Sequence, residues 1–548
     1  MTLRNNLLHN TLQRYRGIAI FGPSGSGKTL TARLISEVNT GFLSLEASTD
    51  VVGPLSKLTD LPKLVEALLP FLVLHTSPVD RSSKSPAHLT RERARSVYLE
   101  LSARYGPDWV GRLIVGLSAF HKRSVVVAGV RGFENAAFLK SQGYLLVYLY
   151  GSTEALAARQ SARDATLISD ALQDQQVEAA AYRTSEIQSI SHLALDSTVI
   201  GARAIVSTIC SRFDARECLT CVNSTANSTI SFGSEGICAN CQNFAQGISH
   251  FRRDEDLRFL TSFRDKNGKY DAMVGMSGGK DSSATAYLLQ TLGFRPLGFT
   301  FDIGYYPEHL FQRASAVAAG LGIDHKVIPI KKYITAASLQ SYKLTADLFD
   351  ASESPDLAKK FSILYGLGRA NYSVKHSTPM PFVRSCVLCR KTVIPAYYAE
   401  AIRHGVRLVV LGMNEWTHLS QRVGSNKSVI SGIRKLQPFA GCDPVYVAHL
   451  PFILGLTKDS LQHILDGLGW VQPAGEDLIE SNSNSCLFAR AAEGMAYRML
   501  GFHPDETRLA REVTVGFIEK ADARRALEKV HTFQKSVRQV LSEAGILT

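Results

Sequence analysis

The chain has 548 residues, 45% of them hydrophobic and 20% charged, with a formal net charge of +12 at pH 7. This composition is that of a globular protein and excludes a disordered or low-complexity chain, and the length favours two or three domains. The sequence contains no run of 18 or more apolar residues, and residues 1–5 lead into no apolar segment. We therefore expect a cytoplasmic protein with no membrane association.

A complete phosphate-binding motif lies near the N-terminus. Residues 22–29 read GPSGSGKT, which fits G-x-x-x-x-G-K-[ST], and they stand between an apolar strand over 18–21 and a helix over 30–36. In this P-loop, backbone N–H groups surround the α- and β-phosphates, the lysine reaches the β/γ oxygens and the threonine binds Mg²⁺. The predicted nucleotide-binding residues are Gly22, Ser24, Gly25, Ser26, Gly27, Lys28 and Thr29.

The segments after the P-loop resemble the small nucleoside and nucleotide kinases. The features that carry this resemblance are strands over 42–45, 124–131, 144–150 and 193–196, and a helix bearing Arg159 and Arg163. In that family, arginines after the last core strand close over the phosphates. Many relatives place an aspartate that assists Mg²⁺ where this chain has Ala128, so Glu46 and Asp50 are the remaining candidate carboxylates. Nucleotide binding is expected, while kinase activity is left open.

Four cysteines form the next signal. The pairs Cys218/Cys221 and Cys238/Cys241 are two C-x-x-C motifs separated by residues 222–237, which is typical of a structural zinc ribbon. Disulfides are the alternative, but a reducing compartment favours metal binding. Residues 230–241 also resemble the ribbon that precedes the ATP loop in N-acetyl sugar amidotransferases.

A second phosphate loop follows the ribbon. Residues 277–282 read SGGKDS, between a strand over 270–276 and a helix that starts near 283. This PP-loop resembles the SGGxDS loop of the N-type ATP pyrophosphatases, which split ATP between the α- and β-phosphates. The glycines let backbone N–H groups face an anion at a helix N-terminus. The predicted ATP-binding residues are Ser277, Gly278, Gly279, Lys280, Asp281 and Ser282, with Lys280 and Asp281 as catalytic groups and Asp281 as the Mg²⁺ ligand.

Alternating strands and helices surround this loop. Strands are expected over 297–302, 325–330 and 407–412, with a helix over 314–321, so a parallel doubly wound sheet is predicted. Asp302 ends its strand where such sheets bind ligands, and is predicted to contact ATP. Many relatives carry a Gly-His-Asn run with acidic residues after the last strand. Here Met413 replaces the histidine, and Glu415 with Trp416 replaces the acidic pair, so the accessory groups are left open.

Three further cysteines lie within or after this domain. Cys386 and Cys389 form a C-x-x-C motif, and Cys486 follows far downstream. This pattern resembles the tRNA thiolases, in which three cysteines hold a [4Fe–4S] cluster, and thiolates suit iron–sulfur chemistry. The resemblance implies that Cys386 and Cys389 take part in catalysis. The alternative is that all three are ordinary buried thiols.

The predicted fold class is α/β, with two doubly wound parallel-sheet domains joined by a small zinc ribbon. The predicted boundaries are 1–213 for the kinase-like domain, 214–250 for the ribbon, 251–500 for the PP-loop domain and 501–548 for a C-terminal helical extension with a helix over 521–541.

The resemblances imply an ATP-dependent enzyme that adenylates a carbonyl or amide oxygen of its substrate and releases pyrophosphate. The internal cysteines favour replacement of that oxygen by sulfur from a sulfur donor. The ribbon instead favours nitrogen, with ammonia from a glutaminase partner. The basic charge suggests a nucleotide, RNA or phosphorylated small-molecule substrate. A nucleotide-sensing regulator without turnover is a third possibility. The expected cofactors are ATP, Mg²⁺ and Zn²⁺, with [4Fe–4S] left open, and nothing indicates the oligomeric state.

Overall fold

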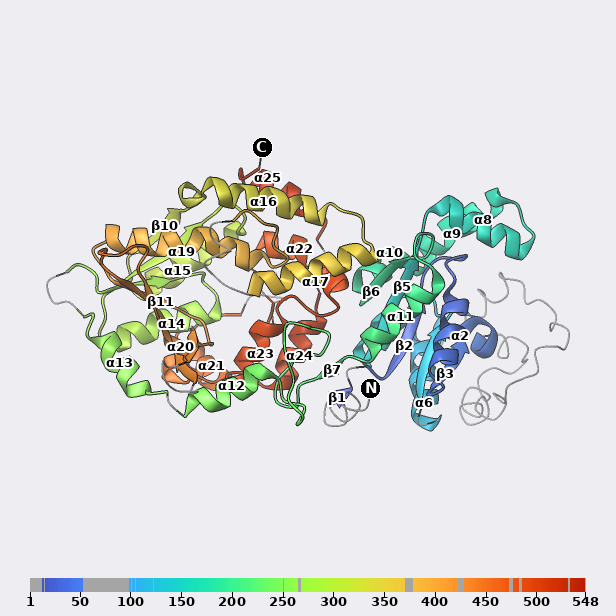
Figure 1. Ribbon diagram of the computed structural model, residues 1–548, viewed down its shortest axis with the longest axis horizontal. Helices are drawn as coiled ribbons and strands as arrows, with labels where there is room; N and C mark the ends of the chain where they lie inside the picture. Colours follow the sequence, from blue (N-terminus) through green and yellow to red (C-terminus); the bar gives the residue numbers. More distant parts are fainter. Residues whose placement is uncertain are drawn as a thin grey trace. The chain divides into compact units, whose positions relative to one another are not determined.

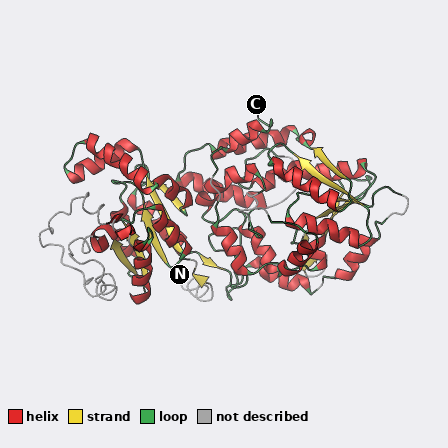
Figure 2. Cartoon of the chain, turned by 180° about the vertical axis from the view of Figure 1, so that it is seen from behind, coloured by secondary structure: helices red, strands yellow, loops and turns green. Residues whose placement is uncertain are grey.

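The computed structural model describes residues 12–13, 15–52, 98–99, 101–103, 105–121, 123–249, 251–264, 268–369, 378–416, 418–421, 428–472, 477–481, 485–530 and 533–547. The chain divides into two compact units. The N-terminal unit comprises Gln13–Ala215 with Glu353–Pro355, and the C-terminal unit comprises the rest of the chain. Within each unit, helices lie on both sides of a central sheet (Figure 1, Figure 2). None of the described helices is both long and apolar enough to cross a membrane.

The N-terminal unit is built on a five-stranded parallel sheet of order β3-β4-β2-β5-β6. Its strands are β2 (Gly17–Phe21), β3 (Phe42–Glu46), β4 (Ser124–Ala128), β5 (Tyr144–Tyr150) and β6 (Leu193–Asp196). Alternate residues of β2 enter different cores, with Ala19 on one face of the sheet and Ile18 on the other. Both faces are therefore covered, as expected for strands that are apolar throughout.

Seven α-helices of the N-terminal unit are described, together with a short π-helix. They are α2 (Lys28–Val38), α6 (Trp109–His121), α7 (Phe133–Ser141), α8 (Thr153–Asp164), α9 (Ile168–Tyr182), α10 (Thr184–Ile190), α11 (Ala202–Phe213) and η1 (Ala47–Val52). Helices α6 and α7 pack on the Ala19 face, and α2 and α11 pack on the Ile18 face. The predicted doubly wound architecture is confirmed for this unit.

The C-terminal unit contains a six-stranded sheet of order β10-β9-β8-β11-β15-β14. Its strands are β8 (Ala272–Gly275), β9 (Pro296–Asp302), β10 (His325–Pro329), β11 (Leu408–Leu411), β14 (Ile433–Leu436) and β15 (Val445–His449). Five strands are parallel, whereas β14 runs antiparallel to β15. The sequence analysis did not predict β14 or β15. The segment that joins them is short, and a short connection produces an antiparallel pair.

Helices cover both faces of this second sheet. The described helices of this unit, of which only some contact the sheet, are α12 (Ala239–Ile248), α13 (Arg253–Thr261), α14 (Lys280–Thr291), α15 (Glu308–Gly320), α16 (Ala336–Phe349), α17 (Pro355–Arg369), α19 (Ser385–Arg403), α20 (Leu450–Leu454), α21 (Lys458–Gly467), α22 (Leu487–Leu500), α23 (Glu506–Thr514), α24 (Lys520–Glu528) and α25 (Val537–Glu543). The smaller elements are β1 (Leu12–Gln13), β7 (Arg216–Glu217), the 3-10 turn η2 (Lys331–Tyr333) and the hairpin strands β12 (His418–Gln421) and β13 (Ser428–Ser431).

The helix predicted over 521–541 is wrong as one element. Helix α24 ends at Glu528, and α25 begins only at Val537. Ser536 starts the second helix with a capping box, in which its side chain accepts a hydrogen bond from Gln539 N–H and the Gln539 side chain bonds back to Ser536 N–H. Local capping therefore divides a segment that composition alone suggested was continuous.

Candidate functional site

The PP-loop connects β8 to α14 at the carboxyl edge of the second sheet. Gly278 has φ of +68°, and a Cβ added there would lie 2.4 Å from Arg313 Cβ on α15. Glycine is therefore required both by the backbone conformation and by this close approach. The indole N–H of Trp470 donates to the Gly278 carbonyl at 3.1 Å and fixes the loop from another side.

Hydrogen bonds within the PP-loop hold it in shape. The Ser282 hydroxyl accepts from Ser277 N–H at 3.1 Å and donates to the Gly279 carbonyl at 3.0 Å. Ser283 donates to the same carbonyl at 2.9 Å, and Thr285 donates to the Asp281 carbonyl at 2.6 Å. The loop is thus ordered by its own hydroxyl groups at the N-terminus of α14.

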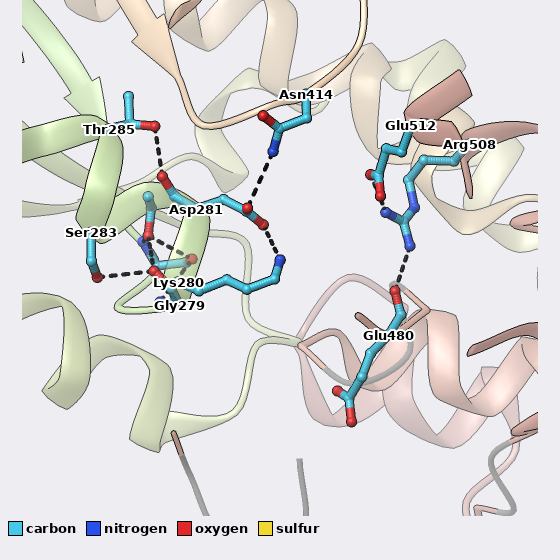
Figure 3. A network of polar contacts seen from close by, with 11 residues as sticks. Gly279, Lys280, Asp281, Ser283, Thr285, Asn414, Glu480, Arg508 and Glu512 are labelled. Atoms are coloured by element: carbon cyan, nitrogen blue, oxygen red, sulfur yellow. Dashed lines mark hydrogen bonds and ion pairs between the residues drawn. The ribbon is translucent and has the colours of Figure 1, made fainter. Parts of the chain in front are cut away.

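The charged residues of the loop meet the end of β11. Lys280 Nζ donates to the Asp281 carboxylate, and Asn414 Nδ2 donates to Asp281 Oδ1 at 3.2 Å (Figure 3). Gly412 allows this approach, because a Cβ there would lie 2.7 Å from the Asp281 carbonyl oxygen. Asn414, which lies between the substituted positions 413 and 415, is therefore a direct partner of Asp281.

Glu415 has a different partner. Arg511 of α23 donates to Glu415 Oε2 at 2.7 Å, and only 7% of the Glu415 side chain is exposed. Burial by itself raises the pKa of Glu415, but Arg511 and the other nearby arginines outweigh it and hold that pKa below its usual value. His449 at the end of β15 hydrogen-bonds to the Glu415 carbonyl at 2.7 Å, and burial lowers the pKa of His449 to about 4.

Helix α23 supplies charged groups that the sequence analysis missed. Arg508 binds the Glu512 carboxylate at 2.6 Å and donates to the Glu480 carbonyl, on the side of the site opposite Lys280 (Figure 3). Burial, with a contribution from Asp281, raises the pKa of Glu512. The residues were assigned only to a helical extension, although the i, i+3, i+4 spacing of Arg508, Arg511 and Glu512 places all three on one helix face.

Asp302 lies at the end of β9, the strand next to β8, and so at the same edge of the sheet as the PP-loop. Its carboxylate accepts the Gly304 N–H at 2.8 Å. A role for Asp302 in binding ATP remains a prediction.

The four cysteines of the expected ribbon come together. The sulfur atoms of Cys218, Cys221, Cys238 and Cys241 lie within 4.8 Å of one another, and all four residues are buried. The Cys238 N–H donates to Cys218 Sγ at 3.2 Å. Among the described residues, this is the single group of three or more His, Cys, Asp or Glu with such geometry. Four converging sulfurs fit one tetrahedral metal ion, for which Zn²⁺ is the usual occupant.

The three other cysteines lie at two helix starts. Cys386 and Cys389 are in the first turns of α19, and Cys486 is the N-cap residue of α22. Burial raises the pKa of Cys389 to about 11, and it also raises the pKa values of Cys386 and Cys486. These thiols lack the close convergence of the four-cysteine group. Ligation of an iron–sulfur cluster, whose irons spread the ligands farther apart, remains a prediction.

The P-loop of the N-terminal unit has a different geometry. Gly22, Gly25 and Gly27 all have positive φ, at 141°, 82° and 82°. A Cβ at Gly22 would lie 2.1 Å from the Leu149 carbonyl oxygen, so the loop contacts β5 closely. Lys28 Nζ donates to the Pro23 carbonyl at 2.8 Å, and burial lowers the pKa of Lys28 to about 8.

Glu46 reaches the P-loop from β3, which is separated from β2 by β4. Thr29 Oγ1 donates to Glu46 Oε2 at 2.6 Å, and Glu46 pairs in register with Ala128. Gly129 makes room for the carboxylate, because a Cβ there would lie 1.7 Å from Glu46 Oε1. Asp50 accepts the Glu46 N–H at 2.8 Å. Of the two candidate carboxylates, Glu46 is the one in contact with the P-loop threonine.

Glu178 on α9 is a P-loop contact that sequence reasoning missed. Ser24 Oγ donates to Glu178 Oε2 at 3.3 Å, and Arg131 pairs with Glu178 Oε1 at 3.1 Å. The two arginines predicted to close over phosphates have other partners, since Arg159 donates to the Ser197 carbonyl and Arg163 pairs with Asp164.

Part of the C-terminal unit matches known proteins in sequence. Residues 254–365, which include the whole PP-loop and Asp302, match the NAD synthase family. A tRNA-specific 2-thiouridylase, MnmA 3 of Bacteroides fragilis, is 37% identical over 83 residues, which is 14% of this chain and 22% of the relative. An uncharacterized protein of Methanocaldococcus jannaschii is 41% identical over 64 residues, 12% of this chain and 31% of the relative. The chain thus spans about a fifth to a third of the relatives that it matches.

Two kinase structures resemble part of the chain. Shikimate kinase from Acinetobacter baumannii is 20% identical, covering 36% of this chain and 93% of the kinase, with a TM-score of 0.21. A gluconokinase from Sinorhizobium meliloti is also 20% identical, covering 30% of this chain and 75% of the kinase, with a TM-score of 0.17. At these scores the likeness supports no functional conclusion. The SGGKDS loop and the family match lead to one identification: the C-terminal half of the chain contains a PP-loop ATP pyrophosphatase domain of the NAD synthase type.

Proposed function

We propose that the protein adenylates a carbonyl or amide oxygen of its substrate with ATP and then replaces that oxygen with sulfur. The observation that carries the first half is the PP-loop, in which Asp281 stands between Lys280 and Asn414 at the carboxyl edge of a parallel sheet. Edges of this kind bind ligands in open α/β folds. The match of residues 254–365 to the NAD synthase family supports the same chemistry.

Lys280, Asp281 and Asn414 have different roles in the adenylation step. The substrate oxygen attacks the α-phosphorus, the bond to the bridging oxygen breaks, and pyrophosphate leaves with the electron pair. The N-terminus of α14 and Lys280 stabilise the negative charge that accumulates on the leaving pyrophosphate. Asp281 would hold Mg²⁺, which supplies further charge neutralisation when bound. Asn414 keeps the Asp281 carboxylate oriented through its amide hydrogen bond.

The second half of the reaction rests on the cysteines and on the 2-thiouridylase likeness. A sulfide equivalent attacks the adenylated carbon, and AMP leaves with the original oxygen. Cys386 and Cys389 lie on α19 and Cys486 caps α22, so the two helix starts present all three thiols. Burial raises the pKa values of these three thiols, so as free groups they are poor nucleophiles at neutral pH. The matching segment of a tRNA-modifying relative and the net charge of +12 favour a nucleotide or RNA acceptor.

Product analysis tests this proposal. Anaerobically purified protein, incubated with ATP, sulfide and bulk RNA or nucleotides, should release AMP and pyrophosphate and produce a thiolated product detectable by mass spectrometry. A brown iron-containing protein supports the thiolation half. Absence of pyrophosphate release with every acceptor class would leave only a nucleotide-sensing regulator and overturn the enzyme proposal.

Nitrogen transfer is the second candidate. It is favoured by the four-cysteine segment, because residues 230–241 resemble the ribbon of N-acetyl sugar amidotransferases. In that case ammonia from a glutaminase partner displaces AMP and gives an amine or amidine. Replacing sulfide with ammonium in the same assay separates the two candidates, since each predicts a product of different mass.

The N-terminal unit is proposed to bind a second nucleotide. Thr29 and Glu46, which are hydrogen-bonded in the free protein, would share Mg²⁺ when ATP is present. We propose that this unit either phosphorylates the acceptor before adenylation or controls the second site through nucleotide occupancy. Formation of ADP from ATP, with an acceptor-dependent rate, distinguishes a kinase from a regulator.

A further inference from the structure

Helix α23 is held at its N-terminal end by the four-cysteine segment, defined as residues 216–241. Ser224 donates to the Glu506 carboxylate through its backbone N–H and through its hydroxyl, both at 3.0 Å, and Glu506 is fully buried. Asn227 donates to Thr507 Oγ1 at 3.5 Å. The two bonds from Ser224 offset part of the cost of burying the Glu506 carboxylate, so they favour the observed register between the two segments.

The other end of α23 meets a metal-ligand cysteine. Cys241 Sγ lies 3.3 Å from Thr514 Oγ1, in the last turn of the helix. Helix α24 adds to this contact, because Arg524 binds Glu217 and Lys520 donates to the Cys218 carbonyl. The four cysteines also share one hydrophobic core with Leu509 of α23 and with α24. The metal site and the helix are therefore parts of one packed body.

The opposite face of α23 carries the charges of the ATP site. Arg511 binds Glu415, and Arg508 binds Glu512, facing Lys280 (Figure 3). A second link passes through Trp416. Phe244 of α12, the helix that contains Cys241, stacks on the Trp416 ring with centroids 5.2 Å apart, and Arg511 lies over the same ring at 5.8 Å.

We infer that the four-cysteine segment is a positioning element for ATP chemistry, which holds α23 so that Arg508, Arg511 and Glu512 complete the site opposite the PP-loop. This inference rests on the proposed function and extends it to the regulation of the same site by metal occupancy. A helix of nine residues is too short to be stable alone, so tertiary contacts must fix its position. Metal bound by the four thiolates fixes the segment that makes those contacts.

Metal removal is the first test. The zinc-loaded and chelator-treated full chain are compared by hydrogen exchange and by tryptophan fluorescence, with metal content measured directly. We expect faster exchange in residues 506–514 and a changed emission in the metal-free protein, while β8, which lies outside the core of the four cysteines, keeps its protection. Trp416→Phe should reduce the metal-dependent emission change, and Trp470→Phe measures the contribution of the other tryptophan that packs near the four cysteines. Unchanged exchange in α23 after complete metal loss would overturn the inference, whether or not the protein makes AMP.

A second test keeps the metal in place. Thr514→Val removes the hydroxyl next to Cys241 at nearly constant volume, Thr514→Ser restores it, and Ser224→Ala weakens the other end of α23. We expect Thr514→Val and Ser224→Ala to lower kcat for AMP formation roughly tenfold, since small misplacements of active-site groups are costly. The KM for ATP and the zinc content should change little, and Thr514→Ser should recover most of the rate.

Thr208 provides a matched control for the threonine variants. Thr208 lies in α11 of the N-terminal unit and donates to the Ala204 carbonyl at 2.9 Å, as Thr514 donates to the Ala510 carbonyl at 2.6 Å. Unlike Thr514, Thr208 is not hydrogen-bonded to a cysteine among the described residues. Thr208→Val should leave kcat unchanged. Equal kcat values for Thr514→Val, Ser224→Ala and the unaltered protein would contradict the positioning role. Absence of AMP formation by the zinc-loaded unaltered protein would instead contradict the proposed function, and the exchange experiment would then decide the inference alone.

Discussion

The P-loop and the PP-loop are both predicted to bind phosphate groups, but they differ in glycine conformation and in hydrogen-bond partners. In the P-loop, Gly22, Gly25 and Gly27 have positive φ, whereas in the PP-loop only Gly278 does. The P-loop side chains bond to strands and helices beyond the loop, as Thr29 does to Glu46. The PP-loop hydroxyls bond mainly to the loop itself.

The two loops also differ in the source of the carboxylate that is proposed to bind Mg²⁺. The P-loop contains no acidic residue of its own, and Glu46 arrives from β3 through the space left by Gly129. The PP-loop carries its own Asp281, and the sheet contributes an amide, Asn414, to orient it. Both loops lie at the start of a helix, but the P-loop depends on three glycines with positive φ, whereas the PP-loop has one and is held by its own hydroxyl groups.

The largest expected effect is at the PP-loop. Asp281→Asn removes a proposed Mg²⁺ ligand while keeping the side-chain shape, so we expect AMP and pyrophosphate formation to fall about 10²–10³-fold. The melting temperature should change little, because Asp281 is partly exposed. Pyrophosphate release is the measurement. A rate equal to that of the unaltered protein would remove Asp281 from the mechanism.

Lys28→Ala gives the reciprocal experiment at the P-loop. Loss of a charged contact to phosphate is worth about 1.5–3 kcal/mol, so nucleotide binding at this site should weaken about 10–100-fold. AMP formation by the C-terminal unit should persist when the acceptor is in excess. Calorimetric titration with a non-hydrolysable ATP analogue measures the first effect. Loss of AMP formation in this variant would show that the two loops are coupled rather than independent.

Gly129→Ala tests whether the Glu46 carboxylate serves the P-loop. The new methyl group would overlap Glu46 Oε1 and the residue would keep a φ of +74°, which costs roughly 1–3 kcal/mol of strain. We expect Glu46 to leave Thr29 and the Mg²⁺ dependence of nucleotide binding to weaken. Glu46→Gln should reproduce the metal effect without the loss of stability. If Gly129→Ala binds Mg²⁺-nucleotide normally, Glu46 is not the metal partner.

The smallest effect is a pH dependence of the P-loop alone. Burial lowers the pKa of Lys28 to about 8 from an unfolded value of 10.5, so the unfolded chain binds more protons between these values and the nucleotide-free unit gains stability as pH rises through that window. Phosphates favour the charged lysine, so nucleotide affinity should fall as pH rises above about 8, by at most about tenfold per pH unit. Titrations in buffers of different ionisation enthalpy should show proton uptake on binding, which Lys28→Arg abolishes.

Much of the site could be predicted because each short motif determines the local backbone structure around it. Residues 277–282 and 22–29 each lie between an apolar strand and a helix, and both helices begin within the motif. The four cysteines were recognisable for the same reason, since two C-x-x-C pairs place sulfurs at fixed local spacing and only their meeting required the fold. Local periodicity failed at 521–541, where the capping box at Ser536 restarts the helix.

By itself, the sequence determined the two phosphate loops, the α/β class and the four-sulfur group, because each depends on neighbouring residues or on strand periodicity. Only the tertiary structure decided which distant groups face those loops. Glu46 meets Thr29 although β4 separates β3 from β2, and Glu178 meets Ser24 through α9. Helix α23 places Arg508 on the side of the site opposite Lys280. These contacts join residues far apart in the chain, and their pairing follows from packing rather than from any local pattern.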